Sequence, residues 1–575
     1  MIKTLTKQIK EFKKDSILSI VFVTMEVVFE IIIPILMAFI IDMGVEKGNI
    51  QYVWGMGAVM IIVAMCSLFC GVMSGKYAAS ASTGVARNLR DAMFRNIQNF
   101  SFSNLDKYST AGLVTRLTTD VTNVQNAYQM IVRMCARAPF MLIFAMTMTI
   151  IVSGKLSLIF LGAILFLGVV LGFIVTKAFP KFEQVFKKYD ALNASVQENV
   201  NAIRVVKAYV REDHEVKKFN KASEAVYRLF IGAEKMVVLN MPVMQFVMYA
   251  CILLLSWLGA KMIVAGNLTT GELMSLFTYV MNILMSLMMI SMAFVMITLS
   301  KASAERIAEV INEESNLTNG ADPVYEVKDG SIEFNHVAFG YREGVDVLSD
   351  LNFKINAGET IGIIGGTGSS KSSLVQLIPR LYDVTQGQVK VGNVDVCKYD
   401  IETLRDEVAM VLQKNVLFSG TINDNIRWGN ANASEEEIQR VCRLAQADEF
   451  IQTFPKKYET YIEQGGSNVS GGQKQRLCIA RALLKKPKIL ILDDSTSAVD
   501  TKTDTLIRKA FLEEIPDTTK LIIAQRISSV QDADRIMVLN DGKIIDFGTH
   551  EELLKTSEIY RDVYESQVKG GGIDE

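Results

Sequence analysis

The chain has 575 residues, half of them hydrophobic, and its mean hydropathy is +0.25. This length exceeds what one hydrophobic core can hold, and the positive hydropathy excludes a wholly soluble protein, so we expect at least two domains and a membrane part. The formal net charge of -2 gives no sign of nucleic-acid binding, and the seven cysteines lack C-x-x-C spacing, so neither a zinc site nor a disulfide framework is indicated.

The first 15 residues, MIKTLTKQIKEFKKD, form a basic amphipathic segment. The apolar run that follows is too long for a signal-peptide core and lacks a small-residue cleavage site. We therefore expect residues 1–15 to form an elbow helix on the cytoplasmic membrane surface, with its lysines toward anionic lipid headgroups.

Six apolar runs are each long enough, at about 20 residues, to cross a bilayer. They lie near 17–43, 53–77, 132–154, 156–178, 238–263 and 271–299. Arginine and lysine concentrate in the N-terminal segment and in the two long connections, which predicts that these parts are cytoplasmic. The chain is thus expected to cross the cytoplasmic membrane six times, with both termini inside the cell.

The two long connections, roughly 78–131 and 179–237, are polar and rich in helix formers. They predict spanning helices that continue into the cytoplasm, each pair joined by a short crosswise turn. The expected turns are residues 110–124 and the stretch around 211–220, and they need a partner surface because an isolated helix pair gains little without packing.

Composition divides the chain into five parts. An all-α transmembrane domain at 16–302 follows the elbow at 1–15, and a polar linker at 303–330 precedes an α/β domain at 331–569, in which β-rich runs alternate with helical ones. Residues 535–548 hold two such runs around Asp541-Gly542, which predicts a β-hairpin. The tail at 570–575 is expected to be disordered.

Residues 361–374, IGIIGGTGSSKSSL, predict a strand, a glycine-rich loop and a helix start. Backbone N–H groups of such a loop bind phosphates, while Lys371 reaches the β- and γ-phosphates and Ser372 holds Mg²⁺. The G-x-x-x-x-G-K-[ST] pattern holds at Gly365 but is broken by Ser370, whose Cβ narrows the backbone choice. The other residues expected to contact ATP here are Thr367, Gly368, Ser369 and Ser373.

A second motif, ILILDDSTSAVD at 489–500, predicts a buried parallel strand that delivers Asp493 to the metal ion of a nucleotide. Together with the phosphate loop and NVSGGQKQRLCIARAL at 468–483, this motif resembles the nucleotide-binding domain of ABC transporters. Six spans ahead of that domain resemble an exporter-type half-transporter, so the likeness covers nearly the whole chain. It implies an ABC-type transport ATPase that uses ATP and Mg²⁺.

The resemblance assigns further roles residue by residue. Tyr341 matches the aromatic that stacks on adenine, Gln413 the glutamine that contacts the metal, and Asp500 the loop that communicates across the dimer. The signature motif, which closes on the γ-phosphate of ATP held by the opposite domain, matches Ser470, Gly471, Gly472 and Gln473. The two crosswise turns resemble coupling helices, which seat in grooves of the nucleotide domains.

Two positions depart from the family pattern. Its catalytic base is a glutamate, whereas Asp494 is one methylene shorter, and its switch histidine is replaced by Gln525. A base must come within about 2.6–3.2 Å of the proton that it removes, and a neutral amide cannot supply a proton-sensitive contact to the γ-phosphate.

The loss of both groups beside an intact signature resembles the degenerate subunit of a bacterial heterodimeric multidrug exporter. The partner is then a second half-transporter with an intact catalytic glutamate and switch histidine. The alternatives are a lipid flippase, a homodimeric exporter that tolerates both changes, and, in another class, an ATP-gated channel or regulatory subunit that does not pump.

The last two spans are rich in methionine, including Met281, Met285 and Met292. Flexible thioethers can line an adaptable cavity for hydrophobic small molecules, although they also serve as filler between helices or toward lipid. We therefore expect these three side chains to be candidates for a substrate cavity.

Glu26 and Glu30 lie four residues apart on one face of the first span. Counting back from Asp42 at the outer end places them about 18–24 Å inside the membrane, where acidic residues are functional-site hypotheses. Either they bind cationic substrates, or they pair with Arg133 or Arg137 at the inner end of the third span, and we favour the pairing.

Overall fold

The computed structural model describes residues 1–570 except positions 343 and 496. Nearly all of the tail that we expected to be disordered, 570–575, lies outside the described residues. The described chain forms two compact units, which we call the helical unit and the α/β unit. The helical unit comprises Met1–Asn99 and Ser109–Glu313, and the α/β unit comprises Phe100–Tyr108 and Glu314–Glu575.

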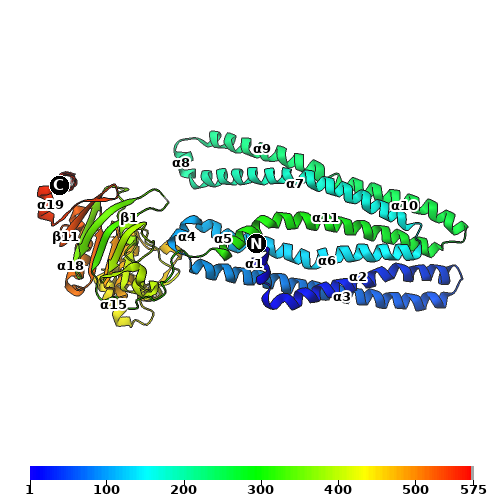
Figure 1. Cartoon of the computed structure of the whole chain (residues 1–575), viewed down its shortest axis with the longest axis horizontal. Coiled ribbons are helices and arrows are strands. Elements are labelled where there is room, and N and C mark those ends of the chain that lie inside the picture. The colour runs from blue at the N-terminus through cyan, green and yellow to red at the C-terminus, as the bar shows by residue number, and fades with distance from the viewer. Residues whose placement is uncertain (343, 496, 571–575) are drawn as a thin grey trace. The chain divides into compact units, whose positions relative to one another are not determined.

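The helical unit contains six helical segments that are long and apolar enough to cross a membrane, which confirms the predicted number (Figure 1). Its elements are α1 (Ile2–Lys7), a 3₁₀ turn (Lys10–Phe12), α2 (Lys13–Phe39), a π-helical turn (Ile40–Val45), α3 (Ile50–Gln98), α5 (Thr110–Thr115), a second π-helical turn (Arg116–Asp120), α6 (Val121–Val152), α7 (Ser157–Asn201), α8 (Ile203–Ala208), α9 (Glu212–Val237), α10 (Asn240–Val264) and α11 (Thr270–Asn312).

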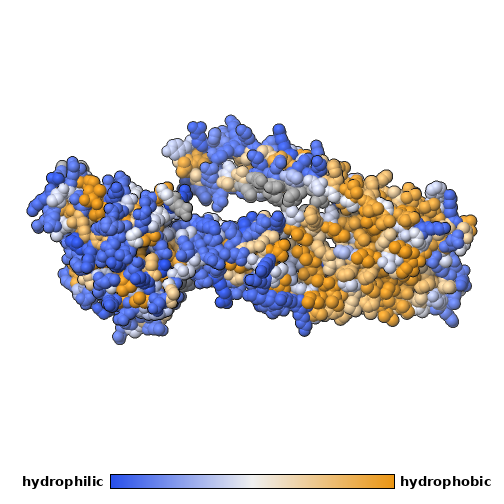
Figure 2. Space-filling view, viewed as in Figure 1, coloured by the Kyte–Doolittle hydropathy of each residue, from blue (hydrophilic) through white to orange (hydrophobic). Residues whose placement is uncertain are grey.

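The long helices of this unit exceed the thickness of a bilayer. Helix α3 has 49 residues, which is about 74 Å at 1.5 Å per residue, whereas the hydrocarbon core measures about 30 Å. Figure 2 shows the consequence within this unit: an orange apolar band crosses the helices near one end, with blue residues at the tips beyond it, and the opposite part of the helices is mostly blue. The predicted polar extensions are therefore continuations of the membrane helices.

The core of the helical unit lies where α2, α6, α7, α10 and α11 meet. Val27, Leu167, Leu255 and Leu276 are each fully buried there. Tyr279 of α11 is also fully buried, and its hydroxyl donates to the carbonyl of Ile31 in α2 at 2.9 Å. That bond satisfies the one polar group that the ring brings into an apolar core.

Both crosswise turns are misplaced in the sequence-based prediction. Residues 110–124 form the start of the third spanning helix, and residues 212–217 begin α9. The short helices are instead α4 (Phe102–Lys107), which belongs to the α/β unit, and α8 (Ile203–Ala208). Side-chain caps explain the first error, because Ser101 forms a capping box that starts α4 and Ser109 caps α5.

The linker is also shorter than predicted, because α11 continues to Asn312. At its end, the side chain of Asn96 in α3 donates to the carbonyls of Val310 and Glu313, each at 2.8 Å. These bonds satisfy carbonyls that a helix C-terminus leaves without intrahelical partners. Helical structure therefore extends ten residues past the predicted boundary at 302.

The α/β unit contains a six-stranded sheet in the order β12-β11-β3-β10-β9-β6, a four-stranded sheet in the order β2-β1-β4-β5 and a β7-β8 pair. Its strands are β1 (Ile332–Phe339), β2 (Leu348–Ile355), β3 (Thr360–Gly365), β4 (Gln386–Val391), β5 (Val394–Asp395), β6 (Val408–Val411), β7 (Gly420–Thr421), β8 (Tyr461–Ile462), β9 (Ile489–Asp493), β10 (Thr519–Ile523), β11 (Arg535–Asn540) and β12 (Lys543–Gly548). Its helices, besides α4, are α12 (Lys371–Gln376), α13 (Ile401–Glu407), α14 (Ile422–Arg427), α15 (Glu435–Leu444), α16 (Asp448–Thr453), α17 (Gly471–Leu484), α18 (Thr501–Glu514), α19 (His550–Thr556) and α20 (Glu558–Gly570).

The larger sheet brings the predicted motifs to one edge. Strands β3, β10 and β9 are parallel neighbours, and Ile523 pairs with Ile363 on one side and with Asp493 on the other. Because parallel strands end at the same edge, the phosphate loop, the DD pair and the loop after β10 leave the sheet side by side. The predicted hairpin at Asp541-Gly542 is confirmed by the antiparallel pairing of β11 and β12.

Candidate functional site

A cavity of about 560 Å³ lies at this edge of the sheet. It is lined by residues 364–373 together with Gln413, Asp493, Asp494, Ile523, Gln525 and Val563. Apart from Val563, Ile523, Ile364 and Gly366, all of these positions were predicted from sequence motifs. The structure therefore brings the phosphate loop, the predicted metal-binding positions and the predicted base and switch positions into one cavity.

The phosphate loop connects β3 to α12. A Cβ on Gly365 would come within 2.2 Å of the carbonyl oxygen of Leu539 in the adjacent strand, so only glycine fits there. The ammonium group of Lys371 donates to the carbonyls of Gly365 and Gly366, each at 2.8 Å, and to the hydroxyl of Ser369 at 3.2 Å. Burial lowers the pKa of Lys371, and the nearby carboxylates of Asp493 and Asp494 act in the opposite direction.

Ser370 adopts a left-handed backbone conformation, with φ +68° and ψ 25°. The sequence predicted a constraint at this position, and the structure shows which one: a side chain occupies a conformation that costs about 1–2 kcal/mol for residues other than glycine. Gly368, two residues earlier, also has a positive φ of 87°. The loop therefore keeps its turn at the cost of local backbone strain.

The residues at the metal-binding positions fit Mg²⁺. The hydroxyl of Ser372 donates to Asp493 Oδ1 at 3.0 Å, and Gln413 lines the same cavity. Hydroxyl, carboxylate and amide oxygens are suitable ligands for this hard cation. Asp493 is 3% exposed, and burial raises its pKa, with the Asp494 carboxylate adding to the effect and the Ser372 hydroxyl and Lys371 opposing it.

The side chains at the predicted base position, Asp494, and the predicted switch position, Gln525, form a hydrogen bond with each other. Gln525 Nε2 donates to Asp494 Oδ2 at 2.9 Å. The backbone of Asp494 is left-handed, with φ 49°, and its N–H donates to the carbonyl of Ile523 at 3.1 Å. One oxygen of the Asp494 carboxylate is thus engaged by the Gln525 amide, at the position where the resemblance predicts a histidine.

Tyr341 lies beside the helix that follows the phosphate loop. Its hydroxyl shares a hydrogen bond with Ser373 Oγ at 2.9 Å, and its ring packs edge-on against Tyr382 at 5.2 Å between centroids. The Tyr382 hydroxyl in turn donates to Asp106 of α4 at 2.7 Å. Neither Tyr382 nor Asp106 belongs to a recognisable sequence motif, because their contact depends on where α4 packs within the α/β unit.

The signature residues lie outside this cavity. Ser470 caps α17 in a capping box with Gln473, and neither Gly471 nor Gly472 lines the described cavity. Asp500 caps α18 by accepting from the N–H of Thr503 at 3.0 Å. The helix N-terminus at Ser470 offers free backbone N–H groups and a positive end, which suit an anion brought from elsewhere.

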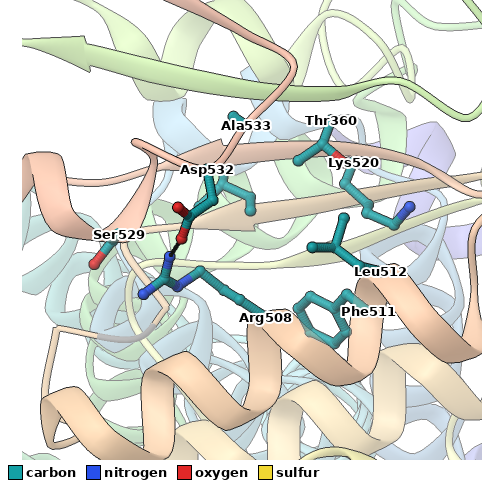
Figure 3. Close-up of a pocket in the computed structure, with 9 residues that line it drawn as sticks. Thr360, Arg508, Phe511, Leu512, Lys520, Ser529, Asp532 and Ala533 are labelled. Carbon is teal, nitrogen blue, oxygen red and sulfur yellow. Dashed lines mark hydrogen bonds and ion pairs between the residues drawn. The ribbon is translucent and has the colours of Figure 1, made fainter. Parts of the chain in front are cut away.

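A second, much smaller cavity lies elsewhere in the α/β unit. It measures about 20 Å³, enough for about one water molecule, and Figure 3 shows Arg508, Lys520 and Asp532 around it. Arg508 donates to Asp532 Oδ2 at 2.9 Å. Lys520 is 1% exposed, and burial lowers its pKa. This cavity shares no lining residue with the larger one and is too small for a nucleotide.

In the helical unit, the two acidic residues of α2 bind an arginine of α6. Arg137 donates one nitrogen to Glu26 and the other to Glu30 Oε2, the latter at 2.6 Å. Arg133 lies beside Gly75 of α3, where an added Cβ would be 3.5 Å from its guanidinium. The expected pairing is thus present, with Arg137 as the partner.

Three methionines of α11, predicted as cavity candidates, are largely exposed, whereas Met288 of the same helix packs against the core. Met281, Met285 and Met292 are 42%, 56% and 52% exposed. Their spacing of four and seven residues places them along one side of the helix. They remain candidates for a substrate-contacting surface.

Two family profiles match the chain. The ABC transporter transmembrane region matches residues 16–288, and the ABC transporter profile matches residues 348–497. The chain therefore belongs to the ABC transporter family, and it combines a membrane domain with the ATP-binding domain of a transport ATPase.

Its relatives include the ABC transporter ATP-binding protein YfiB of Bacillus subtilis, which is 39% identical over 551 residues, 96% of each chain. The ATP-dependent lipid A-core flippase of Desulfotalea psychrophila is 32% identical over 80% of each chain. The solved structure of a bacterial Atm1-family ABC exporter with ATP bound superposes with a TM-score of 0.82 and 22% identity, covering 97% of this chain and 98% of that one. This last likeness shows the fold.

Proposed function

We propose that the chain is one half of a heterodimeric exporter that uses ATP to move hydrophobic or amphipathic small molecules, of the multidrug type, out across the cytoplasmic membrane. The observation that carries the proposal is the hydrogen bond between Gln525 and Asp494. It engages a carboxylate that is already one methylene shorter than glutamate, so the base is poorly placed to reach an attacking water.

ATP binding itself needs other groups, and these are intact. The loop amides and Lys371 hold the β- and γ-phosphates, Tyr341 supplies a ring face for adenine, and Ser372, Asp493 and Gln413 hold Mg²⁺, which neutralises phosphate charge when bound. This site therefore binds ATP and hydrolyses it slowly. The signature at Ser470–Gln473 completes the hydrolytic site of the partner.

The proposed partner is a second half-transporter with a catalytic glutamate and a switch histidine. ATP held between the two ATP-binding domains draws them together, and crosswise helices carry that motion to the spans. Hydrolysis at the partner's site then resets the transporter. Both termini of this chain lie in the cytoplasm in this proposal, as the distribution of lysine and arginine predicts.

The proposed substrate class is supported by the side chains that the membrane helices expose. The exposed methionines on α11 offer adaptable apolar contacts, whereas Glu26 and Glu30 are engaged by Arg137 and support the packing of α2 against α6. Lipid flipping is a second candidate, because one relative is a lipid A-core flippase. Transport assays with a fluorescent drug and with a fluorescent phospholipid in the same proteoliposomes distinguish the two.

ATP turnover in lipid tests the heterodimer directly. We expect little turnover from this chain alone and substantial turnover when the partner is co-purified with it. Replacing the partner's catalytic glutamate should abolish that activity, whereas Asp494→Ala should change it by less than about twofold. Brisk turnover by this chain alone would instead assign Asp494 as a working base in a homodimer. Nucleotide-gated ion current without substrate transport would indicate the channel alternative.

A further inference from the structure

The C-terminal helix α20 contacts the switch loop through one side chain. Gln567 Nε2 donates to the carbonyl of Gln525, and the N–H of Ile527 donates to Gln567 Oε1, each at 2.8 Å. A single side-chain amide thus spans the backbone on both sides of Arg526, which is extended at φ -100° and ψ 129°.

Helix α20 is firmly attached to the α/β unit near its start. Tyr560 is fully buried, and its hydroxyl shares a hydrogen bond with His550 Nδ1 at 2.7 Å. Its ring belongs to the same apolar core as Ile527 and Val530, which follow the switch position. One turn later, Val563 lines the nucleotide cavity. The helix therefore offers a rigid base from which Gln567 reaches the loop.

We propose that Gln567 is a positioning residue for the switch position, and that α20 through it controls how long ATP stays in this chain's site. The inference rests on the proposed function, in which this site retains ATP. Gln567 is not itself among the residues that line the cavity; it acts through the backbone of Gln525, which is.

The physical basis is preorganisation. With its carbonyl held by Gln567, the backbone of Gln525 keeps the orientation in which its own side chain reaches Asp494. Without the amide, the loop gains conformational freedom that nucleotide binding must then remove, which weakens binding. Because two hydrogen bonds are lost, we expect ATP to dissociate about fivefold faster.

The test uses the full chain with its partner in lipid nanodiscs. Fluorescent MANT-ATP with Mg²⁺ is loaded and chased with unlabelled ATP, and the slow release phase reports on this chain's site. Gln567→Leu removes both hydrogen bonds at similar size, and Gln567→Glu keeps an acceptor for Ile527 but loses the donor. Ser566→Ala is the matched control, because among the described residues its hydroxyl bonds only within its own helix, to the carbonyl of Val563.

We expect fast release from Gln567→Leu, intermediate release from Gln567→Glu and unchanged release from Ser566→Ala, with similar melting temperatures for all. A double-mutant cycle with Gln525→Ala separates positioning from a general structural role. If Gln567 acts through Gln525, the Gln567→Leu effect shrinks in the Gln525→Ala background.

The outcomes separate the two proposals. Equally slow MANT-ATP release from the unmodified protein and from Gln567→Leu would overturn the positioning role of Gln567, but it would agree with a site that retains ATP. Equal effects of Gln567→Leu with and without the Gln525 side chain would also overturn it. Absence of any slow phase in the unmodified protein would refute the retaining site itself.

Discussion

Replacing Asp494 with glutamate should restore hydrolysis to this chain's site. The carboxylate of Asp494 now accepts from Gln525 Nε2 at 2.9 Å, and the added methylene extends its reach by about 1.5 Å. Since a misplacement of about 1 Å costs on the order of 10²-fold in rate, and a general base contributes about 10²–10⁴-fold, we expect Asp494→Glu to raise turnover about tenfold. Adding Gln525→His should bring the gain to about 10²-fold, or about 2.7 kcal/mol of barrier.

The assay is phosphate release in lipid from a heterodimer whose partner carries glutamine in place of its catalytic glutamate, so that only this chain's site contributes. Lys371→Ala on top of the restored pair is the control, because it removes phosphate binding and should abolish the gain. Turnover that stays at background in the doubly restored protein would refute the reasoning, since the base and switch would then not be what limits hydrolysis here.

Three further predictions concern packing and strain. Ser370→Gly removes a side chain from a left-handed position and should raise stability by about 0.5–1 kcal/mol net, seen as a higher melting temperature; a lower one would contradict the strain. Gly84→Val places atoms where the ring of Phe12 lies, 2.3 Å from an added Cβ, and should expose the N-terminal segment to limited proteolysis, unlike Gly57→Val in open space. Arg137→Gln leaves Glu26 and Glu30 of α2 without their positive partner and should lower the free energy of unfolding by about 2 kcal/mol. Neutralising both acidic residues as well should restore the stability without changing the substrate profile.

Local patterns were enough to predict the chemistry-bearing parts of the α/β unit. The phosphate loop, Asp493 at the end of β9 and the hairpin at Asp541-Gly542 each depend on residues within one short stretch, because a strand, a turn and a helix start are set by neighbouring residues. Sequence also indicated that Asp494 and Gln525 depart from the family. That they bind each other could not be predicted, since it requires the parallel register of β9 and β10.

What the sequence-based prediction misplaced or missed depends either on a helix cap or on tertiary contacts. The short helix α4 begins at the capping box of Ser101 and Asn104, a few residues before the stretch that the sequence predicts to form the turn. The roles of Tyr382 and Gln567 depend on contacts between segments far apart in the chain: Tyr382 with α4, and Gln567 with the loop after β10. No spacing rule in a single sequence reports such contacts.

The two positions that depart from the family pattern share one expected role, in the hydrolysis of ATP. Lys371 and Asp493, which are expected to hold phosphate and Mg²⁺, are retained, and so is the signature motif, whereas the two changed side chains stand at positions expected to act at the γ-phosphate. A hydrolytic group contributes to the transition state far more than to binding, so its loss lengthens occupancy without weakening affinity. In the proposed heterodimer, this difference would let one ATP hold the two domains together while the partner's site cycles, and Gln567 would set how long that hold lasts.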